Sequence, residues 1–218
     1  MKTYDAFFPD VLPDLPGITA DMAIRAIRHT VIEFCEKSLI YQVTQDPITL
    51  QAGLDTYDLD APKGYRVHKV MKAWFKGTEL TPIAPDDLTA PDPYLQTASA
   101  AGYTVTKEPP KGFLQKDFDT VTFSPVPDQA YLNAITMRVA LVPLRDSSGC
   151  ENFLYEQWGE IIACGAKARL MLNPGKPYTN PDAAAMNQAR YVTGVNDARQ
   201  RAARGNVRST LTVQMRQA

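Results

Sequence analysis

The sequence predicts an α+β fold, in which a small helical bundle carries a β-rich insertion and ends in an extended C-terminal arm. Three observations lead to this prediction: where the prolines fall, how the spacing of apolar residues changes along the chain, and how the last residues alternate. Helical spacing at both ends with strand spacing between them differs from the alternating βαβ pattern of nucleotide-binding folds. We expect one N-terminal and two C-terminal helices in the bundle.

Prolines mark where helices can form. All seventeen lie outside three windows, which are residues 17–46, 144–173 and 182–218. A proline inside a helix removes a backbone hydrogen bond and clashes with the preceding turn, so long helices are confined to these windows.

The first helix is predicted over about residues 20–39, with Thr19 as N-cap and Asp21 in its first turn. Apolar residues recur along one face of this segment, as a helix packed on a core requires. They are Ile24, Ile27, Val31, Phe34 and Cys35. The prolines of the preceding segment predict an extended lead whose apolar side chains pack over this helix or over a neighbouring surface.

Two further helices are predicted near the C-terminus. The first begins at a candidate capping box formed by Ser148 and Glu151. Its apolar stripe comprises Leu154, Trp158, Ile161, Gly165, Ala168 and Leu172. The second begins with Asn180 as N-cap and Pro181 in the first helical position, and runs to about Arg204.

Between these helical segments the apolar residues alternate with a period of two, which predicts strands. The predicted strands cover residues 42–50, 56–59, 66–75, 78–82, 103–106, 120–123 and 131–142. Lys76 and Gly77 predict a tight hairpin turn, and the polar residues 83–102 predict a long excursion. The resulting domains are 1–40 (lead and first helix), 41–144 (β-rich insertion), 145–204 (two helices completing the helical domain) and 205–218 (arm).

The arm follows Gly205, a residue that commonly ends helices, and has the pattern of a half-buried strand. Apolar residues occupy one parity, namely Val207, Leu211, Val213 and Met215. Polar residues occupy the other, namely Arg208, Thr210, Thr212, Gln214 and Arg216. A terminal strand with no local partner suits the sheet or groove of another protein. A frayed tail and a strand that returns to its own sheet are the alternatives.

Charge is distributed unevenly although the net charge is −1. From residue 160 onward there are three acidic and nine basic residues, whereas residues 41–93 hold eight acidic and five basic ones. The basic end is rich in arginine, which suits carboxylates, backbone carbonyls or phosphate. No stacking aromatics and no helix-turn-helix signature accompany it, so we interpret these arginines as protein-facing or as lying near DNA without sequence readout.

Sequence motifs for catalysis or cofactor binding are not found. The chain has no Walker loop, GxGxxG or GxSxG, and its two histidines, His29 and His68, are too few for most metal sites. The pairs Asp58/Asp60 and Asp117/Asp119 each place two carboxylates on one strand face, as hydrolases sometimes require. We favour solvated turn residues there, and therefore expect no catalytic residue, no metal and no cofactor.

Cysteine usage predicts buried thiols. The three cysteines form no CxxC pair, and Cys35 and Cys164 fall on apolar helix faces, where a thiol packs as a small hydrophobe. We therefore expect a reducing cytoplasm, at least until assembly. No apolar run approaches a membrane span, and the first residues are not followed by a signal-peptide core, so no membrane partner is expected.

A resemblance to a known family rests on residues 10–17 (DVLPDLPG) leading into residues 26–38 (AIRHTVIEFCEKS). This opening resembles that of tailed-phage head–tail adaptor proteins, also called head-completion or connector proteins. The hairpin at residues 76–82, the strand ending at residues 123–127 and the helix containing Trp158 agree with it in order and spacing.

The resemblance implies a structural role in the neck or tail of the virion, after assembly in the host cytoplasm. Such adaptors form a ring, commonly a dodecamer, beneath the portal protein at the vertex where genomic DNA leaves. Their C-terminal extensions often clasp the portal, and the ring then offers a platform to the tail nozzle, tube or fibres. With its long β-insertion and no tube-forming signature, the chain resembles the adaptors of short-tailed phages best.

Carried onto this chain, the resemblance implies roles for two groups of residues. The portal-binding arm would use Val207, Arg208, Leu211, Val213, Met215 and Arg216. Basic residues between subunits or facing the channel would be Arg190, Arg199, Arg201 and Arg204. The alternatives are another neck or tail-completion protein, or a phage-encoded hydrolase that uses one of the aspartate pairs.

Overall fold

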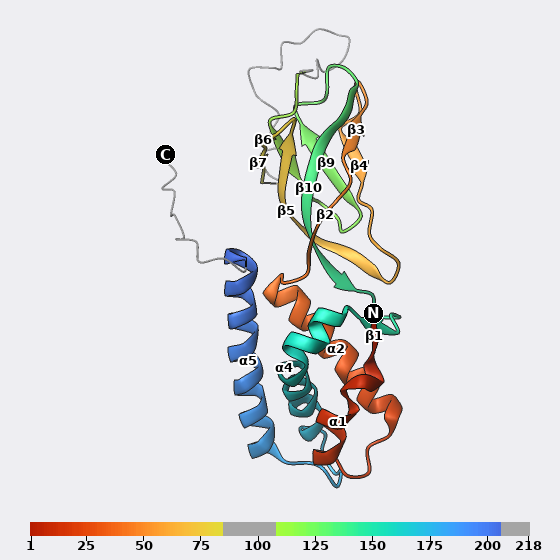
Figure 1. The fold of residues 1–218 in the computed structure, drawn as a ribbon, viewed down its shortest axis with the longest axis vertical. Helices are drawn as coiled ribbons and strands as arrows, with labels where there is room; N and C mark the ends of the chain where they lie inside the picture. Colours follow the sequence, from red (N-terminus) through yellow and green to blue (C-terminus); the bar gives the residue numbers. More distant parts are fainter. Residues whose placement is uncertain (85–107, 206–218) are drawn as a thin grey trace, which may run out of the picture. The chain divides into compact units, whose positions relative to one another are not determined.

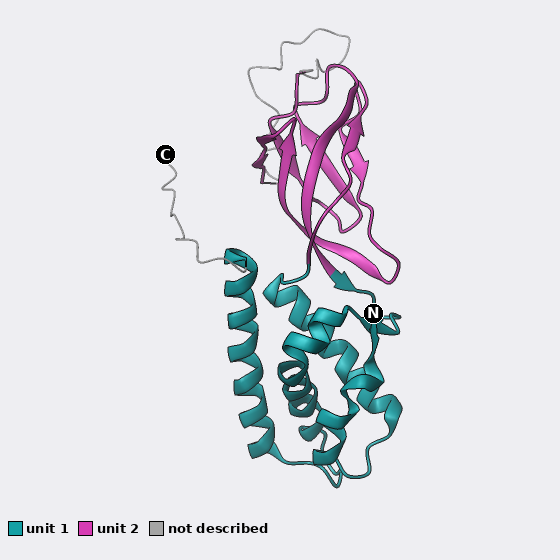
Figure 2. Cartoon of the chain, viewed as in Figure 1, with its two compact units in different colours: residues 1–41, 142–218 teal, residues 42–141 magenta. Residues whose placement is uncertain are grey.

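The computed structural model describes residues 1–84 and 108–205 of the 218-residue chain. The predicted strand at residues 103–106 and the arm beyond Gly205 lie outside the described residues. The chain divides into two compact units (Figure 2): unit 1 comprises Met1–Tyr41 and Val142–Ala218, and unit 2 comprises Gln42–Leu141. Long helices occur in unit 1 and sheets in unit 2, so the prediction of an α+β fold is confirmed.

The long helices of unit 1 are α2 (Ala20–Ser38), α4 (Asn152–Met171) and α5 (Pro181–Arg204), and each contacts the other two (Figure 1). The start of α5 is as predicted, because the Asn180 side-chain oxygen accepts a hydrogen bond from the Ala183 amide at 3.0 Å. The start of α2 after Thr19 is also confirmed.

The predicted capping box at Ser148 is wrong. Glu151 is the N-cap of α4, because the residues just before it are extended. Gly149–Cys150 form strand β11, which pairs antiparallel with β1 (Lys2–Thr3). At the other end, Leu172 is the C-cap of α4 and is 63% exposed, so it does not belong to the buried stripe as predicted.

The N-terminal lead is helical rather than extended, contrary to prediction. It consists of the 3-10 turn η1 (Tyr4–Phe7), the short helix α1 (Phe8–Val11) and the 3-10 turn η2 (Leu12–Asp14). Pro9 and Pro13 stand in the first two positions of α1 and η2, respectively, where a missing amide hydrogen breaks no helical bond. Four apolar side chains of the lead are buried, namely Tyr4, Phe7, Val11 and Leu15.

The core of unit 1 is centred on aromatic contacts between the three long helices. The Phe34 ring of α2 lies 5.5 Å from the Trp158 ring of α4 and 6.4 Å from the Tyr191 ring of α5. On another side of α4, Phe7 of the lead packs edge-on against Tyr155 at 5.1 Å. These contacts hold the lead, α2 and α5 together around α4.

Unit 2 contains two sheets. The five-stranded sheet has the order β2 (Gln42–Thr44), β10 (Tyr131–Pro143), β5 (Tyr65–Phe75), β6 (Thr78–Glu79), with β3 (Ile48–Leu50) also pairing with β10. The four-stranded sheet has the order β4 (Thr56–Asp58), β9 (Thr120–Ser124), β8 (Gly112–Leu114), β7 (Thr81–Pro82). Strands β7 and β8 pair in parallel. The other strand pairs of these two sheets whose register is seen in the described residues are antiparallel.

Two predicted strands are each divided in the structure, and strands β1, β8 and β11 were missed. The predicted strand at 42–50 breaks into β2 and β3 around Pro47, which cannot donate a ladder hydrogen bond. The predicted strand at 78–82 divides into β6 and β7, which belong to different sheets. Strand β8 is three residues long, too short to show an alternation in sequence.

The predicted hairpin turn at Lys76 and Gly77 is confirmed. Both residues have positive φ, 47° and 87°, and Phe75 pairs with Thr78 across the antiparallel β5–β6 ladder. Two central residues with positive φ match the right-handed twist of the flanking strands.

Glycine in α4 provides a test of the helix packing in unit 1. A Cβ at Gly165 would lie 2.6 Å from the Thr30 methyl carbon and 2.7 Å from the Tyr191 ring. A Cβ at Gly159 would meet atoms no nearer than 3.8 Å. Gly165→Ala should therefore lower the free energy of unfolding by about 1–2 kcal/mol, because overpacking outweighs the gain in helix propensity.

The matched control is Gly159→Ala, which should leave the free energy of unfolding unchanged or raise it by up to about 1 kcal/mol. Urea denaturation followed by far-UV circular dichroism measures both variants. Equal stability of the two variants would contradict the close packing of α2, α4 and α5 at Gly165.

Candidate functional site

The arginines predicted between subunits or at the channel all lie on α5, and all four side chains are exposed. With about 3.6 residues per turn, Arg190, Arg201 and Arg204 fall on one flank of α5 and Arg199 falls on the opposite flank. The structure therefore divides this group, although the four residues are close in sequence.

The solvent-facing surface of α5 between these flanks carries small and apolar side chains together with polar ones, namely Thr193, Asn196 and Gln200. Its exposed residues include Ala185, Ala189, Val192 and Ala203. Val192 is 48% exposed and Met186, at the edge of this surface, is 64% exposed. The opposite face of α5 packs on α4, where Gly194 lies directly against Ile161.

The predicted portal-binding residues lie outside the described part of the chain. They are Val207, Arg208, Leu211, Val213, Met215 and Arg216. Their role stays a prediction. What the structure describes is the start of the arm, where the Gly205 amide donates to the Arg201 carbonyl oxygen at 2.8 Å and closes the last turn of α5.

A second basic group, which the sequence did not predict, lies on unit 1. Four arginines and one histidine make up this group, which we call the α2 basic face: Arg25, Arg28, His29, Arg145 and Arg169. Arg28 donates from Nη1 to the Arg145 carbonyl oxygen at 2.8 Å, and its guanidinium lies 5.6 Å from the centre of the Tyr4 ring. The face combines α2, the β10–β11 connection and α4, so no local sequence pattern reveals it.

The charges of the α2 basic face act on His29. Partial burial lowers the pKa of its imidazole, and the guanidinium groups of Arg169, Arg145, Arg28 and Arg25 lower it further. The four guanidinium groups therefore lie close enough to His29 to disfavour protonation of its imidazole.

Glu33 is a carboxylate on α2 that contacts one of these cations, Arg169. Its side chain accepts hydrogen bonds from Lys37 and Arg169. Burial tends to raise the pKa of Glu33, but these two bonds outweigh burial and hold it below its usual value. Glu33 thus joins α2 to α4 and neutralises part of Arg169.

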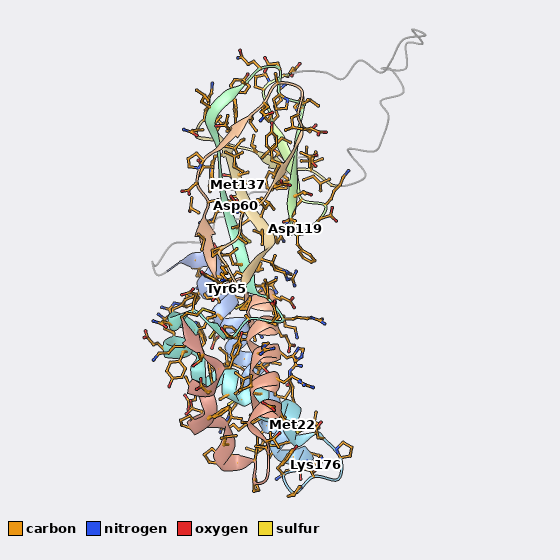
Figure 3. The ribbon with its side chains drawn as sticks, turned by 90° about the vertical axis from the view of Figure 1, so that its right-hand side faces the viewer. Met22, Asp60, Tyr65, Asp119, Met137 and Lys176 are labelled. Atoms are coloured by element: carbon orange, nitrogen blue, oxygen red, sulfur yellow. The ribbon has the colours of Figure 1, made fainter. Side chains whose placement is uncertain are left out.

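The aspartates of the hydrolase alternative come together in unit 2. Asp58 on β4 lies opposite Thr120 on β9, and the Leu59 amide donates to the Asp119 carbonyl oxygen at 2.7 Å. Figure 3 shows Asp60 and Asp119 on this unit. All four aspartate side chains are exposed, whereas catalytic carboxylates are typically set in contrasting surroundings, one apolar and one polar.

A cavity of about 780 Å³ opens beside two of these aspartates, Asp117 and Asp119. Its other lining residues include His68 and the buried apolar residues Phe113 and Leu114. Among the residues that the structure describes, no three histidine, cysteine or acidic side chains gather in a way that would hold a metal ion. Within the same residues no helix has the length and apolar character needed to cross a bilayer.

The three cysteines are free and buried, so the prediction of buried thiols at Cys35 and Cys164 is confirmed. Burial raises the pKa of the Cys150 thiol to about 12 and raises that of Cys35 as well. Both thiols are therefore protonated and unreactive at neutral pH.

Thiol reactivity tests this burial. At about pH 8, Cys35 and Cys150 of the native protein should fail to react with Ellman's reagent, because the reacting species is the exposed thiolate. In denaturant all three cysteines should react, and this total is the internal control. Fast reaction of Cys35 or Cys150 before unfolding would show that unit 1 opens or packs differently.

Arginine is enriched at protein–protein interfaces, so the exposed arginines of unit 1 are compatible with assembly. The chain belongs to the SU10 adaptor protein family, whose sequence model matches residues 2–214. No curated protein matches the chain. The match confirms the resemblance to phage head–tail adaptors, and an adaptor of this family is a structural, non-enzymatic kind of protein that interacts with head and tail components. The assignment to a short-tailed phage stays a prediction.

Proposed function

We propose that the protein forms an adaptor ring that joins the capsid portal to the tail, continues the DNA channel and docks on the portal through residues 205–218. The observation that supports this proposal most strongly is the family match, which covers residues 2–214. The match extends over most of the arm, so the arm is part of what the family shares and not an unrelated extension.

The docking step uses the arm that begins at the end of α5. A 24-residue helix anchored on α4 gives the arm a fixed starting point. In the proposed complex the arm adds a strand to the portal or enters a groove on it. Val207, Leu211, Val213 and Met215 face the portal, and Arg208 and Arg216 meet acidic or carbonyl-rich surface.

The proposed ring contains twelve copies, whose helices pack between neighbouring subunits. The exposed small residues of α5, such as Ala185 and Ala189, support this proposal because they allow a neighbouring helix to approach closely. Arg190, Arg199, Arg201 and Arg204 then lie between subunits or beside the channel, where genomic DNA passes without sequence readout. Unit 2 projects outward or toward the tail nozzle, tube or fibres.

Removal of the arm tests the docking role. A chain that ends after Arg204 should fold normally but fail to join portal-containing heads, because the proposed contact is lost. Co-sedimentation of the purified protein with heads, followed by electron microscopy of the neck, measures the joining.

A matched pair of full-length variants separates the two faces of the arm. Serine at Val207, Leu211, Val213 and Met215 should abolish joining, whereas serine at Thr210, Thr212 and Gln214 should leave it nearly unchanged. Normal joining by the chain that ends after Arg204 would show that the arm does not dock the protein on the portal.

A further inference from the structure

Unit 1 carries a basic surface and an acidic surface on different sides of helix α4. One side is the α2 basic face, formed by Arg25, Arg28, His29, Arg145 and Arg169. The other carries Glu156 and Glu160, which are exposed on successive turns of α4. We call this second surface the α4 acidic flank.

Helical geometry places the two surfaces apart. Trp158 and Gly165 of α4 contact Phe34 and Thr30 of α2, respectively. With about 3.6 residues per turn, Glu156 and Glu160 point away from these contacts and so away from α2. Both side chains stay exposed, although α4 also packs against α5 and the N-terminal helical turns.

Neither surface is fully paired by the described residues of the same chain. Glu33 offsets part of the basic face, but it is shared between Lys37 and Arg169. Within residues 1–84 and 108–205, no ion pair involves Arg25, Arg145, Glu156 or Glu160. The charges therefore remain available to an outside partner.

We propose that the α2 basic face of one copy of this chain docks on the α4 acidic flank of a second copy. This contact rests on the proposed function, for which it supplies the surfaces that join neighbouring subunits. Because the two surfaces differ, the contact is heterologous: each copy uses one surface toward one neighbour and the other surface toward the next. Repetition in one direction gives a ring when the rotation closes.

A second copy fits the observations better than a nucleic acid does. DNA would pair with the basic face alone and leave Glu156 and Glu160 without a partner, whereas a second copy pairs both surfaces. Guanidinium groups can hold carboxylates through paired hydrogen bonds, which fixes the orientation of the two groups relative to each other. One turn before Arg25, Met22 is 37% exposed on α2 and adds apolar contact (Figure 3).

Charge reversal tests the contact in the full-length protein. One variant carries Arg25→Glu and Arg145→Glu, two exposed side chains of the basic face. The other carries Glu156→Lys and Glu160→Lys. Arg28 is left unchanged, because it packs on Tyr4 and bonds the Arg145 carbonyl oxygen. Circular dichroism and thermal melting verify that both variants fold.

Each variant alone should weaken self-association by about tenfold or more, measured by light scattering coupled to size exclusion. An equimolar mixture of the two variants should regain self-association, because each reversed surface then meets an opposite charge. Wild-type association should also weaken with added salt, since the paired charges are screened. The control is Lys63→Glu with Asp46→Lys, a matched exchange of exposed charges on unit 2 that should change nothing.

Three results would overturn the inference: a wild-type chain that stays monomeric at all concentrations, a mixture that does not recover, or a basic-face variant that loses duplex DNA binding while self-association is unchanged. A measurement of how well each variant joins portal-containing heads distinguishes failure of this contact from failure of the adaptor role. If both variants join heads as well as the wild type, the contact is wrong and the role stands. If the copies associate through these surfaces but no particle contains the protein, the role is wrong and the contact stands.

Discussion

Unit 1 depends on the close approach of three helices at Gly165. A hydrogen is the largest substituent that fits there, since a Cβ would collide with the Thr30 methyl carbon at 2.6 Å and with the Tyr191 ring. This approach brings Phe34 onto both Trp158 and Tyr191. The aromatic cluster fixes how each helix is rotated about its axis. Rotation in turn decides which side chains of α2, α4 and α5 reach solvent.

The distribution of charge follows from that packing. Helix α4 is covered by α2, α5 and the N-terminal lead, so its exposed surface is narrow and carries Glu156 and Glu160. Helix α2 buries one face and turns Arg25 and His29 outward, where Arg145 and Arg169 join them. A sequence with a net charge of −1 thereby presents a basic and an acidic surface on the same unit.

Helix positions could be predicted because their signals are local. Proline-free windows and the Asn180–Pro181 start depend on backbone chemistry within a few residues. The Ser148 capping box was mispredicted because tertiary pairing overrode it: Lys2–Thr3 hold Gly149–Cys150 in a ladder. The lead was mispredicted because its prolines predict an extended chain, whereas Pro9 and Pro13 occupy the first two positions of α1 and η2, which tolerate proline. The candidate surfaces were harder to predict. Arginines close in sequence on α5 were divided between flanks, and the α2 basic face combines segments more than a hundred residues apart.

In the proposed assembly, an arm that docks and a ring that closes would place complementary demands on the same chain. A short strand that becomes ordered only on binding loses conformational entropy, which limits the affinity of one arm. A ring presents many arms at once, and after the first arm binds, the others act at high effective concentration. Individually weak arms then suffice for a stable neck, provided that contacts between subunits hold the ring together. The lateral charges of unit 1 would therefore set the strength of portal docking, although they are not part of the arm.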